Sequence, residues 1–293
     1  MKPGIELVRL IAVILITFTH TRNNLESGFT YFIVEELPKY GTAILSIISG
    51  YLYYTISRHK AGLFDKKIKS LVIPYLIANF SILFLVLIFN YGFGYNPLNR
   101  LFYDWSIILE GLFSLNSPPI NPPTYFIRDI FILFSIIALI TQKEWKALLV
   151  LIPFVLFGKL IIRWDIAFLF VSGIIYAMAS KRLNKNILLS ICGLCIVVVV
   201  LFFDAYLKFP VALFLFMLTV DLKIKYLNTG RFSYLLHLYH SPVMVITYPI
   251  ISYLITDATL RVVTQIIWAI AMAYLLFLTT KKIPVLKILS GGR

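Results

Sequence analysis

Long apolar runs separated by short polar segments recur along the whole chain. A helix needs ~20 mainly apolar residues to cross the hydrocarbon core of a bilayer. Runs that approach or exceed this length follow one another from the first residues to the last. The pattern predicts an all-α, polytopic membrane helix bundle of about ten transmembrane helices. The predicted spans are 4–21, 40–57, 69–90, 123–141, 146–163, 165–180, 187–203, 206–220, 233–255 and 260–280.

Composition agrees with a bilayer-embedded chain. Of the 293 residues, 60% are hydrophobic and 14% are charged, against about 25% charged in soluble domains. No change in composition marks a second domain, so we predict a single membrane-embedded domain over residues 1–293. Glu6 and Arg9 interrupt the first apolar run and no small-residue cleavage site follows, so we expect a retained helix rather than a secretory signal.

Basic residues concentrate in alternate connections, which predicts the orientation. With the N-terminus inside, the outside segments hold few basic residues, and the bias favours an N-in, C-in protein of the cell (inner, cytoplasmic) membrane. The formal net charge of +14 then reflects loops beside anionic lipid rather than nucleic-acid binding. The basic residues of the inside segments are Arg58, Lys60, Lys66, Lys67, Lys69, Lys143, Lys146, Lys181, Arg182, Lys185, Lys223, Lys225, Arg231, Lys281, Lys282, Lys287 and Arg293.

The longest polar connection covers roughly 91–122 and is predicted to lie outside. Within it, Leu101–Leu115 has the pattern of an amphipathic stretch on the membrane surface. Long ordered connections are often lids or binding loops, and a mobile connector is the alternative.

Arg9 and His20 are the candidate chemical centre of the first span, because ionisable groups inside an apolar span are costly. They lie eleven positions apart, so they share one helix face about 16 Å apart along the axis, with Arg9 toward the inside. Histidine suits proton transfer, and arginine holds phosphate or carboxylate in a fixed fork. The alternatives for Arg9 are an i, i+3 pair with Glu6 or snorkelling to the interface, and the alternative for His20 is an interfacial histidine bonded to a neighbouring helix.

Arg128 and Asp129 lie near the outer end of the fourth span, at about the depth of His20. Adjacent positions on a helix diverge by ~100°, so we do not expect the two side chains to pair with each other. We expect one of them to face the bundle interior. A structural salt bridge between helices is the alternative. The partner of His20 stays open between Arg128, Asp129 and a group on another helix.

His237 and His240 share one face of the ninth span at i, i+3 spacing. No carboxylate or cysteine nearby completes a metal site, so we expect no metal there, one packing role and one site-lining role. Cys192 and Cys195 form a C-x-x-C inside an apolar run, which favours two small residues on one helix face over redox or metal chemistry.

Motifs of soluble enzymes are missing from the sequence. It contains no G-x-S-x-G, no P-loop, no H-E-x-x-H and no Gly-rich dinucleotide fingerprint. Soluble-type hydrolase or nucleotidase chemistry therefore has no support.

Five segments together resemble the acyltransferase-3 family of integral membrane acyltransferases. Arg9 to His20 matches the arginine–ten residues–histidine pattern of that family. The other four segments follow in the family's order on the corresponding spans, and the resemblance covers nearly the whole chain. They are Ile47–Tyr53, like its Ser-Gly-Tyr-Leu segment; Phe64–Tyr75, like its basic loop leading into Pro-Tyr; Tyr125–Asp129, like its Trp-Phe-Leu-Arg-Asp; and Leu235–Pro242, like its late Tyr-Leu-x-His-x-Pro.

The resemblance implies a reaction and its substrates. A polysaccharide O-acetyltransferase-like member would move an acyl group, most often acetyl, from cytoplasmic acyl-CoA to a sugar hydroxyl of a lipid-linked or surface glycan. Acetyl-CoA is then the donor substrate, with no permanently bound cofactor. The expected partners are acyl-CoA, the glycan acceptor and membrane lipid, without nucleic acid. The sequence carries no signal for an oligomeric state.

The resemblance also suggests residue roles. His20, Arg9 and Arg128 would be catalytic, with His20 as general base or brief acyl carrier. Arg128 would orient the acceptor or stabilise the oxyanion. Substrate or acyl-CoA binding would fall to Lys66, Lys67, Lys69, Tyr125, Asp129 and His240.

The chain departs from the family pattern at several positions. The paired arginines of the basic loop fall on Lys67 and Ser70, so bidentate contacts are lost there, and Tyr125 replaces tryptophan. No fused esterase-like domain is seen, so we expect any second transfer step to need another protein. The rival hypotheses are a non-enzymatic transporter or flippase of a glycan precursor, and a scaffold with purely structural polar pairs.

Overall fold

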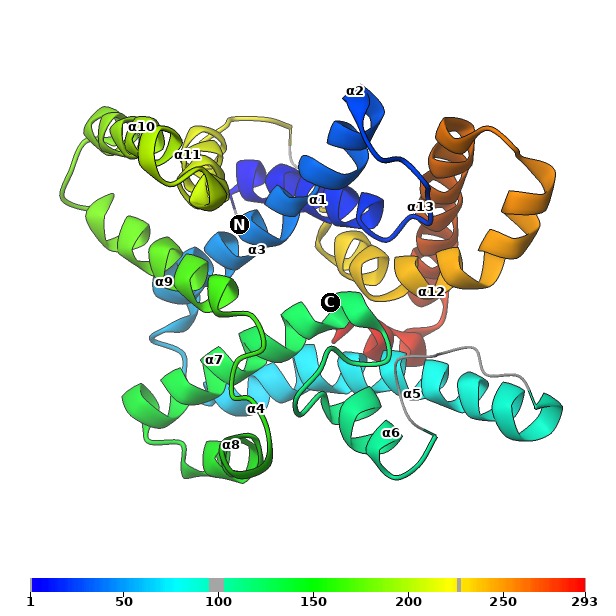
Figure 1. Cartoon of the computed structure of the whole chain (residues 1–293). Coiled ribbons are helices and arrows are strands. Elements are labelled where there is room, and N and C mark those ends of the chain that lie inside the picture. Colours follow the sequence, from blue (N-terminus) through cyan, green and yellow to red (C-terminus); the bar gives the residue numbers. More distant parts are fainter. Residues whose placement is uncertain (1, 95–102, 226–227, 293) are drawn as a thin grey trace.

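The chain folds into helices joined by short connections (Figure 1). The structure is a computed structural model that describes residues 2–94, 103–225 and 228–292, and this part of the chain contains no strand. The helical segments of the first half are α1 (Pro3–Phe18), α2 (Gly28–Tyr31), η1 (Phe32–Glu36), α3 (Lys39–Leu52), η2 (Tyr53–Ser57), α4 (Leu63–Lys67), η3 (Ile68–Val72), α5 (Ile73–Leu87), η4 (Ile88–Gly92), α6 (Ser106–Ile108), η5 (Leu109–Phe113), η6 (Pro122–Thr124) and α7 (Tyr125–Gln142). Those of the second half are η7 (Trp145–Ala147), α8 (Leu148–Phe157), α9 (Trp164–Ala179), α10 (Lys185–Phe202), η8 (Asp204–Tyr206), α11 (Lys208–Thr219), α12 (Gly230–Leu254), α13 (Ala258–Lys282) and η9 (Pro284–Ser290).

The all-α architecture predicted from the apolar runs is confirmed, and every predicted span falls on a helix. Within the described ranges, four helical segments are long and apolar enough to cross a membrane. Many large apolar side chains also face outward, as expected where lipid rather than water surrounds the bundle. The protein is a helical, multi-pass membrane protein, while about ten crossings and the N-in, C-in orientation stay predictions. The four segments are Leu63–Gly92, Pro122–Gln142, Lys185–Phe202 and Ala258–Lys282.

Glycines allow α3 to cross its neighbours at close range. A Cβ placed on Gly50 of α3 would overlap the backbone carbonyl of Phe170 in α9, and one on Gly173 of α9 would overlap that of Ile47. Gly41 faces the backbone of Ala12 in α1 in the same way. In lipid, helices associate mainly through such close packing, because lipid tails are as apolar as the side chains they would replace. The crossings fix α1, α3 and α9 as one packed unit.

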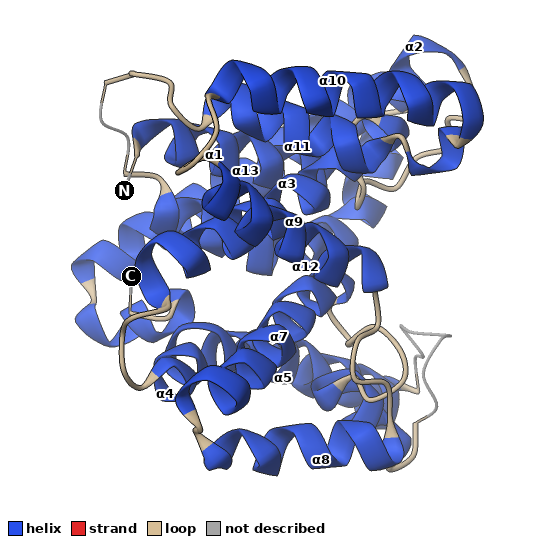
Figure 2. Cartoon of the chain, turned by 90° about the vertical axis from the view of Figure 1, so that its left-hand side faces the viewer, coloured by secondary structure: helices blue, strands red, loops and turns tan. Residues whose placement is uncertain are grey.

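The helices form two groups, with two further helices between them (Figures 1 and 2). Helices α4, α5, α7 and α8 form one group, α1, α3, α10 and α11 form the other, and α9 and α12 lie between them. Both chain termini are on the same side of the molecule, at the left of Figure 2. The start of α12 meets the first turn of α1, because the Thr229 hydroxyl donates to the Glu6 carboxylate at 3.0 Å.

The described part of the long connection before α7 is held in place by its own contacts. Leu101 and Phe102 lie outside the described residues, and the predicted amphipathic stretch is helical over Ser106–Phe113. Partial burial acts to raise the pKa of Glu110, but hydrogen bonds from Ser117 and Asn116 outweigh it and leave the pKa below its usual value. These bonds order the turn that follows, which argues against a mobile connector in this part of the connection.

Candidate active site

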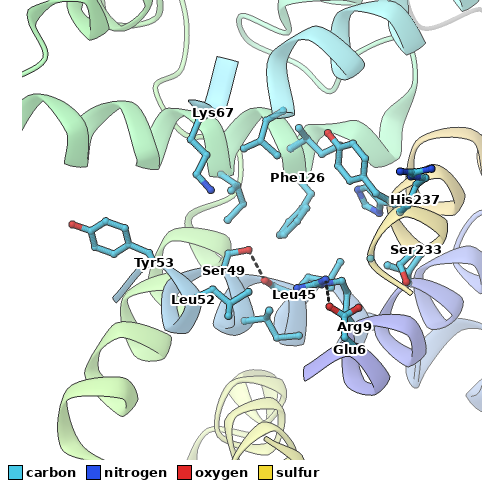
Figure 3. A pocket seen from close by; sticks show the side chains of 18 of the residues that line it. Glu6, Arg9, Leu45, Ser49, Leu52, Tyr53, Lys67, Phe126, Ser233 and His237 are labelled. Atoms are coloured by element: carbon cyan, nitrogen blue, oxygen red, sulfur yellow. Dashed lines mark hydrogen bonds and ion pairs between the residues drawn. The ribbon is translucent and has the colours of Figure 1, made fainter. Parts of the chain in front are cut away.

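A cavity of about 660 Å³ lies between the two helix groups (Figure 3). Helix α1 presents Glu6, Arg9 and Val13 to it, and their i, i+3, i+7 spacing means that one face of α1 forms this wall. Helix α7 presents Phe126 and Phe134 in the same manner. Residues of α3, η2, α4, η3, α12 and α13 complete the wall, together with Asn228 before α12.

One end of the cavity is cationic. Arg9, Lys67, Arg231 and Lys281 line it together with one carboxylate, that of Glu6. They lie near the start of α1, the end of α4, the start of α12 and the end of α13. The end of α13 is near the C-terminus, and the start of α12 contacts the first turn of α1 through Thr229. We call this group of four basic residues the mouth.

Arg9 lines the cavity and also forms the pair with Glu6 that the sequence offered as an alternative. Its guanidinium lies 3.2 Å from the Glu6 carboxylate, which also accepts the hydroxyl of Thr229. The Glu6 side chain is almost fully buried and that of Arg9 is partly exposed. Glu6 therefore orients Arg9 without closing it off from the cavity.

Only Lys67 of the three predicted donor-binding lysines lines the cavity. Its Nζ lies 3.7 Å from the centre of the Phe134 ring, and Figure 3 shows the side chain extending from its helix into the cavity. Lys66 is exposed and donates to the carbonyl of Ala61, and Lys69 is exposed as well. The ~100° step between neighbouring helical positions turns these two lysines away from the wall.

At the inner end of the cavity, away from the mouth, α12 presents the imidazole of His237. Its side chain is 4% exposed, and its ring stands edge-to-face on Phe126 at 5.7 Å between centroids. His237 follows Gly230, another lining residue, by seven positions on α12, which is about 10 Å along the axis. The lining of α12 therefore runs from the mouth inward and ends at this imidazole.

His20 and His240 meet just beyond the inner end. Their ring centroids are 5.1 Å apart, and His240 is 6.3 Å from His237. His240 is fully buried, while His20 is half-buried just past the end of α1. The neighbour of His20, which the sequence left open, is thus the imidazole of His240 on another helix. Neither His20 nor His240 belongs to the cavity wall.

The backbone sets which nitrogen of His240 is available. Nδ1 lies 2.7 Å from the Leu236 carbonyl oxygen, which can only accept, so Nδ1 carries the proton. Nε2 is buried and has no hydrogen-bond partner within the described ranges. In a neutral ring Nε2 can only accept a hydrogen bond. It is therefore the nitrogen of His240 that could accept from the adjacent imidazole of His20.

A proline in α12 explains how the outer connection joins the site. Pro242 has no N–H, so the carbonyl four residues earlier, that of Leu238, loses its usual helical donor. The side-chain amide of Asn121 takes that place and donates to Leu238 at 2.7 Å. The Asn121 backbone N–H in turn donates to Asn79 of α5 at 3.0 Å. The connection is therefore tied to α12 between the two histidines.

The expectation that Arg128 and Asp129 do not pair is wrong. Arg128 donates to Asp129 at 2.7 Å and to the backbone carbonyls of Leu160 and Lys159. Asp129 accepts the backbone N–H of Arg163 at 2.9 Å. Both side chains bend toward the segment before α9, so the angle between their Cβ positions does not keep the charged ends apart. Arg128 lies about 200° around the helix from Phe126, away from the cavity.

Tyr125 also lies away from the cavity wall. The Arg163 guanidinium is 5.6 Å from the centre of its ring, and Arg163 pairs with Asp165, which pairs with Lys208. Tyr125, Asp129 and Arg128 thus belong to one polar cluster at the start of α7. The structure brings Arg9 and Lys67 together in the cavity, places His20 with His240, and separates this cluster from both.

The described residues contain no group of three or more His, Cys, Asp or Glu side chains that could hold a metal ion. Cys192 and Cys195 are both free, the first buried and the second exposed. The Cys192 thiol lies 3.3 Å from the Pro210 carbonyl in α11. Cys192 is therefore a packing residue between α10 and α11.

Sequence reasoning missed three contributors to the site. Arg231 and Lys281 were counted only as loop charges, and Asn121 was not singled out. Pro242 was the available signal for Asn121, because a proline within a helix frees a carbonyl that needs another donor when it is buried. The arrangement suits a ligand with an anionic head at the mouth and a slender, uncharged arm that reaches the histidines.

Comparison with known proteins gives two findings. Residues 2–280 match the acyltransferase-3 family, described as "Acyltransferase domain". The chain is also 27% identical over 172 residues to the succinoglycan biosynthesis protein ExoH of Rhizobium meliloti (strain 1021), an alignment that covers 49% of this chain and 44% of that relative. The match thus spans less than half of the relative's length. No solved structure matches the chain.

Proposed function

Because the chain belongs to the acyltransferase-3 family, we propose that it is a membrane O-acyltransferase that moves an acyl group, acetyl in our proposal, from cytoplasmic acyl-CoA to a sugar hydroxyl of a surface or lipid-linked glycan. The observation that carries this proposal is a cavity with a cationic mouth at one end and His237 at the other, with the rings of His240 and His20 beyond it. The name of the relative, a succinoglycan biosynthesis protein, supports a polysaccharide acceptor.

The proposed setting is the cell membrane, crossed about ten times with both termini in the cytoplasm. The Lys/Arg bias of the connections supports this orientation, and so does the position of both termini on one side of the molecule (Figure 2). In this orientation the mouth opens toward the cytoplasm, where acyl-CoA is made. His20 then lies toward the opposite side, where a glycan acceptor would approach.

We assign donor binding to the mouth. Lys67, Arg9, Arg231 and Lys281 would hold the phosphates of CoA, because charge-assisted contacts to phosphate are among the strongest hydrogen bonds. Lys66 and Lys69 would act only through their charge near the entrance. The acyl-pantetheine arm, which is uncharged, would extend along the apolar wall of α7 toward His237.

We assign the chemistry to His20, with His240 as its positioning residue. His20 would take the proton of the acceptor hydroxyl as its oxygen attacks the acyl carbon, and would return it to the sulfur that leaves. Brief transfer of the acyl group to His20 is the alternative route. His240 would accept a hydrogen bond from His20 at Nε2 and thereby hold His20 in one orientation, as the third group of a catalytic triad does.

For Arg128, Asp129 and Tyr125 we propose an indirect role. The Arg128–Asp129 pair binds the backbone of residues 159–163 and would shape the acceptor side of the protein. This replaces the direct oxyanion role considered from the sequence, because Arg128 already donates to three partners.

Radiolabelled transfer tests the proposal. Membrane vesicles from the native cells, whose own glycan serves as acceptor, are incubated with [¹⁴C]acetyl-CoA with and without the protein. We expect label in the glycan and release of one CoA thiol for each acetyl transferred. Glycan translocation with no consumption of acetyl-CoA would instead support the flippase. Loss of acetylation in the His20→Ala variant, at normal expression, assigns the chemistry to this site.

A further inference from the structure

Two polar side chains of α12 face the cavity without a hydrogen bond of normal geometry. His237 and Ser233 lie four residues apart, one helical turn, and both line the cavity. Ser233 is fully buried and His237 is 4% exposed. Among the described residues, neither ring nitrogen of His237 nor the Ser233 hydroxyl has a hydrogen bond of normal geometry. The Pro123 backbone lies beside the His237 ring.

Other serines of the bundle show what Ser233 lacks. Ser46, Ser49 and Ser135 each donate to the carbonyl four residues earlier in their own helix, at 2.8 to 2.9 Å, as helical serines usually do. Ser233 makes no such bond and lies on the cavity side, together with His237 (Figure 3). A buried polar group without a partner costs free energy, so a pair of them on one wall indicates a ligand.

The inner end of the cavity also needs a donor for the transition state. Attack on a thioester places negative charge on the carbonyl oxygen, and a fixed N–H is the usual means of stabilising it. Arg128 points away, and Val13 and Phe126, which also line the inner end, offer no donor. A neutral imidazole carries one N–H and can serve without transferring a proton.

We propose that His237 is the oxyanion donor of the transfer reaction and that Ser233 holds the pantetheine arm of the donor one turn before it. This inference rests on the proposed acyltransferase function. The Pro123 carbonyl would fix one nitrogen of His237, and the other N–H would donate to the thioester carbonyl oxygen. The acyl carbon would then lie between His237 and His20, whose rings both neighbour that of His240.

The atoms balance in this step. The acceptor oxygen bonds to the acyl carbon while its proton passes to His20, and the carbon–sulfur bond then breaks. The sulfur leaves with the bonding electron pair and takes the proton from His20 as CoA thiol. His237 donates a hydrogen bond throughout and stays neutral, so it neither gains nor loses a proton.

Kinetics in native vesicles test the inference. Initial rates of glycan labelling are measured against acetyl-CoA concentration for His237→Ala, His237→Gln and Ser233→Ala, with Ser135→Ala as the matched buried-serine control. We expect His237→Ala to lower kcat about 10²- to 10³-fold, with KM for acetyl-CoA kept within about threefold. His237→Gln, which retains an N–H donor, should recover about tenfold of that loss. Ser233→Ala should raise KM about fivefold.

Some results would overturn the inference alone. One is a His237→Ala protein that keeps wild-type kcat. Another is a purely KM effect, and a third is a His237→Gln protein that is no faster than His237→Ala although both run as single species in gel filtration. If the wild-type protein transfers no acetyl and consumes no acetyl-CoA, the proposed function itself fails, and the inference fails with it. The wild-type rate therefore separates the two outcomes.

Discussion

The imidazole rings of His20 and His240 lie 5.1 Å apart and are tilted by 55°. They come from segments far apart in the sequence. Because Nδ1 of His240 is hydrogen-bonded to the Leu236 carbonyl, its Nε2 is the nitrogen that could accept a hydrogen bond from His20. This pair, rather than a carboxylate, is the local environment of the proposed base.

Replacing either histidine should separate their roles. His20→Ala should lower transfer by at least about 10²-fold, because it removes the proposed base. His240→Ala should lower it less, by about tenfold, since it removes only the orientation of that base. Rates measured across pH in native vesicles check this, because loss of the positioning residue should also move the acid limb of the profile. Equal activity of His240→Ala and wild type at every pH contradicts the assignment.

Substitution of Lys67 and of its neighbour Lys66 should change the KM for acetyl-CoA to different extents. Lys67→Ala should raise KM for acetyl-CoA by about tenfold, as expected for a charge-assisted contact worth about 1.5 kcal/mol or more. Lys66→Ala is the matched control, because Lys66 is exposed and donates to Ala61 outside the cavity. We expect less than about a twofold change in that variant. Equal effects of the two substitutions would point to general attraction at the membrane surface.

The effects on stability of substituting Asn121 and Pro242 should be coupled. Asn121→Ala leaves the Leu238 carbonyl buried without a donor and should destabilise the protein by about 1–3 kcal/mol. Pro242→Ala restores a backbone N–H at the position that serves this carbonyl in a regular helix. The double variant should therefore recover stability in detergent unfolding or thermal-shift measurements. Strictly additive losses would show that the amide is not replacing the missing helical donor.

Close crossing of α3 and α9 should make Gly50 intolerant of a side chain. Gly50→Val would force a Cβ against the Phe170 carbonyl, so we expect little folded protein in the membrane fraction. Gly193→Ala in α10 is the control, because nothing lies within 4 Å of a Cβ there, and alanine has the higher helix propensity. Normal yield of a Gly50→Val protein would rule out the tight crossing.

Arg128 should affect folding more than kinetics. Arg128→Ala removes the cationic partner of the buried Asp129 and the donor to the Leu160 carbonyl, and breaking a buried pair in this way costs about 3–5 kcal/mol. We expect a lower yield and a lower Tm, with KM for acetyl-CoA unchanged in the fraction that folds. A fully folded variant with no transfer activity would favour the catalytic role suggested by the family resemblance.

Local patterns in the sequence determined much of this protein. The apolar runs predicted every long helix, because the length and polarity of a helix depend on residues close together in the chain. The spacing of Arg9 and His20 predicted one shared helix face; Arg9 lines the cavity, whereas His20 lies just past the end of α1 and outside the cavity wall. The motifs that carry the family resemblance were likewise visible without a structure.

Only the tertiary structure decided which of these faces meet. It placed His240 beside His20, brought Arg231 and Lys281 to the mouth with Lys67, and turned Arg128 onto the segment before α9. The physical reason is that helix periodicity fixes where a side chain leaves its own helix, while its partner depends on contacts between segments far apart in the chain. A long, flexible side chain such as that of Arg128 then bends toward whatever acceptors the neighbouring backbone offers.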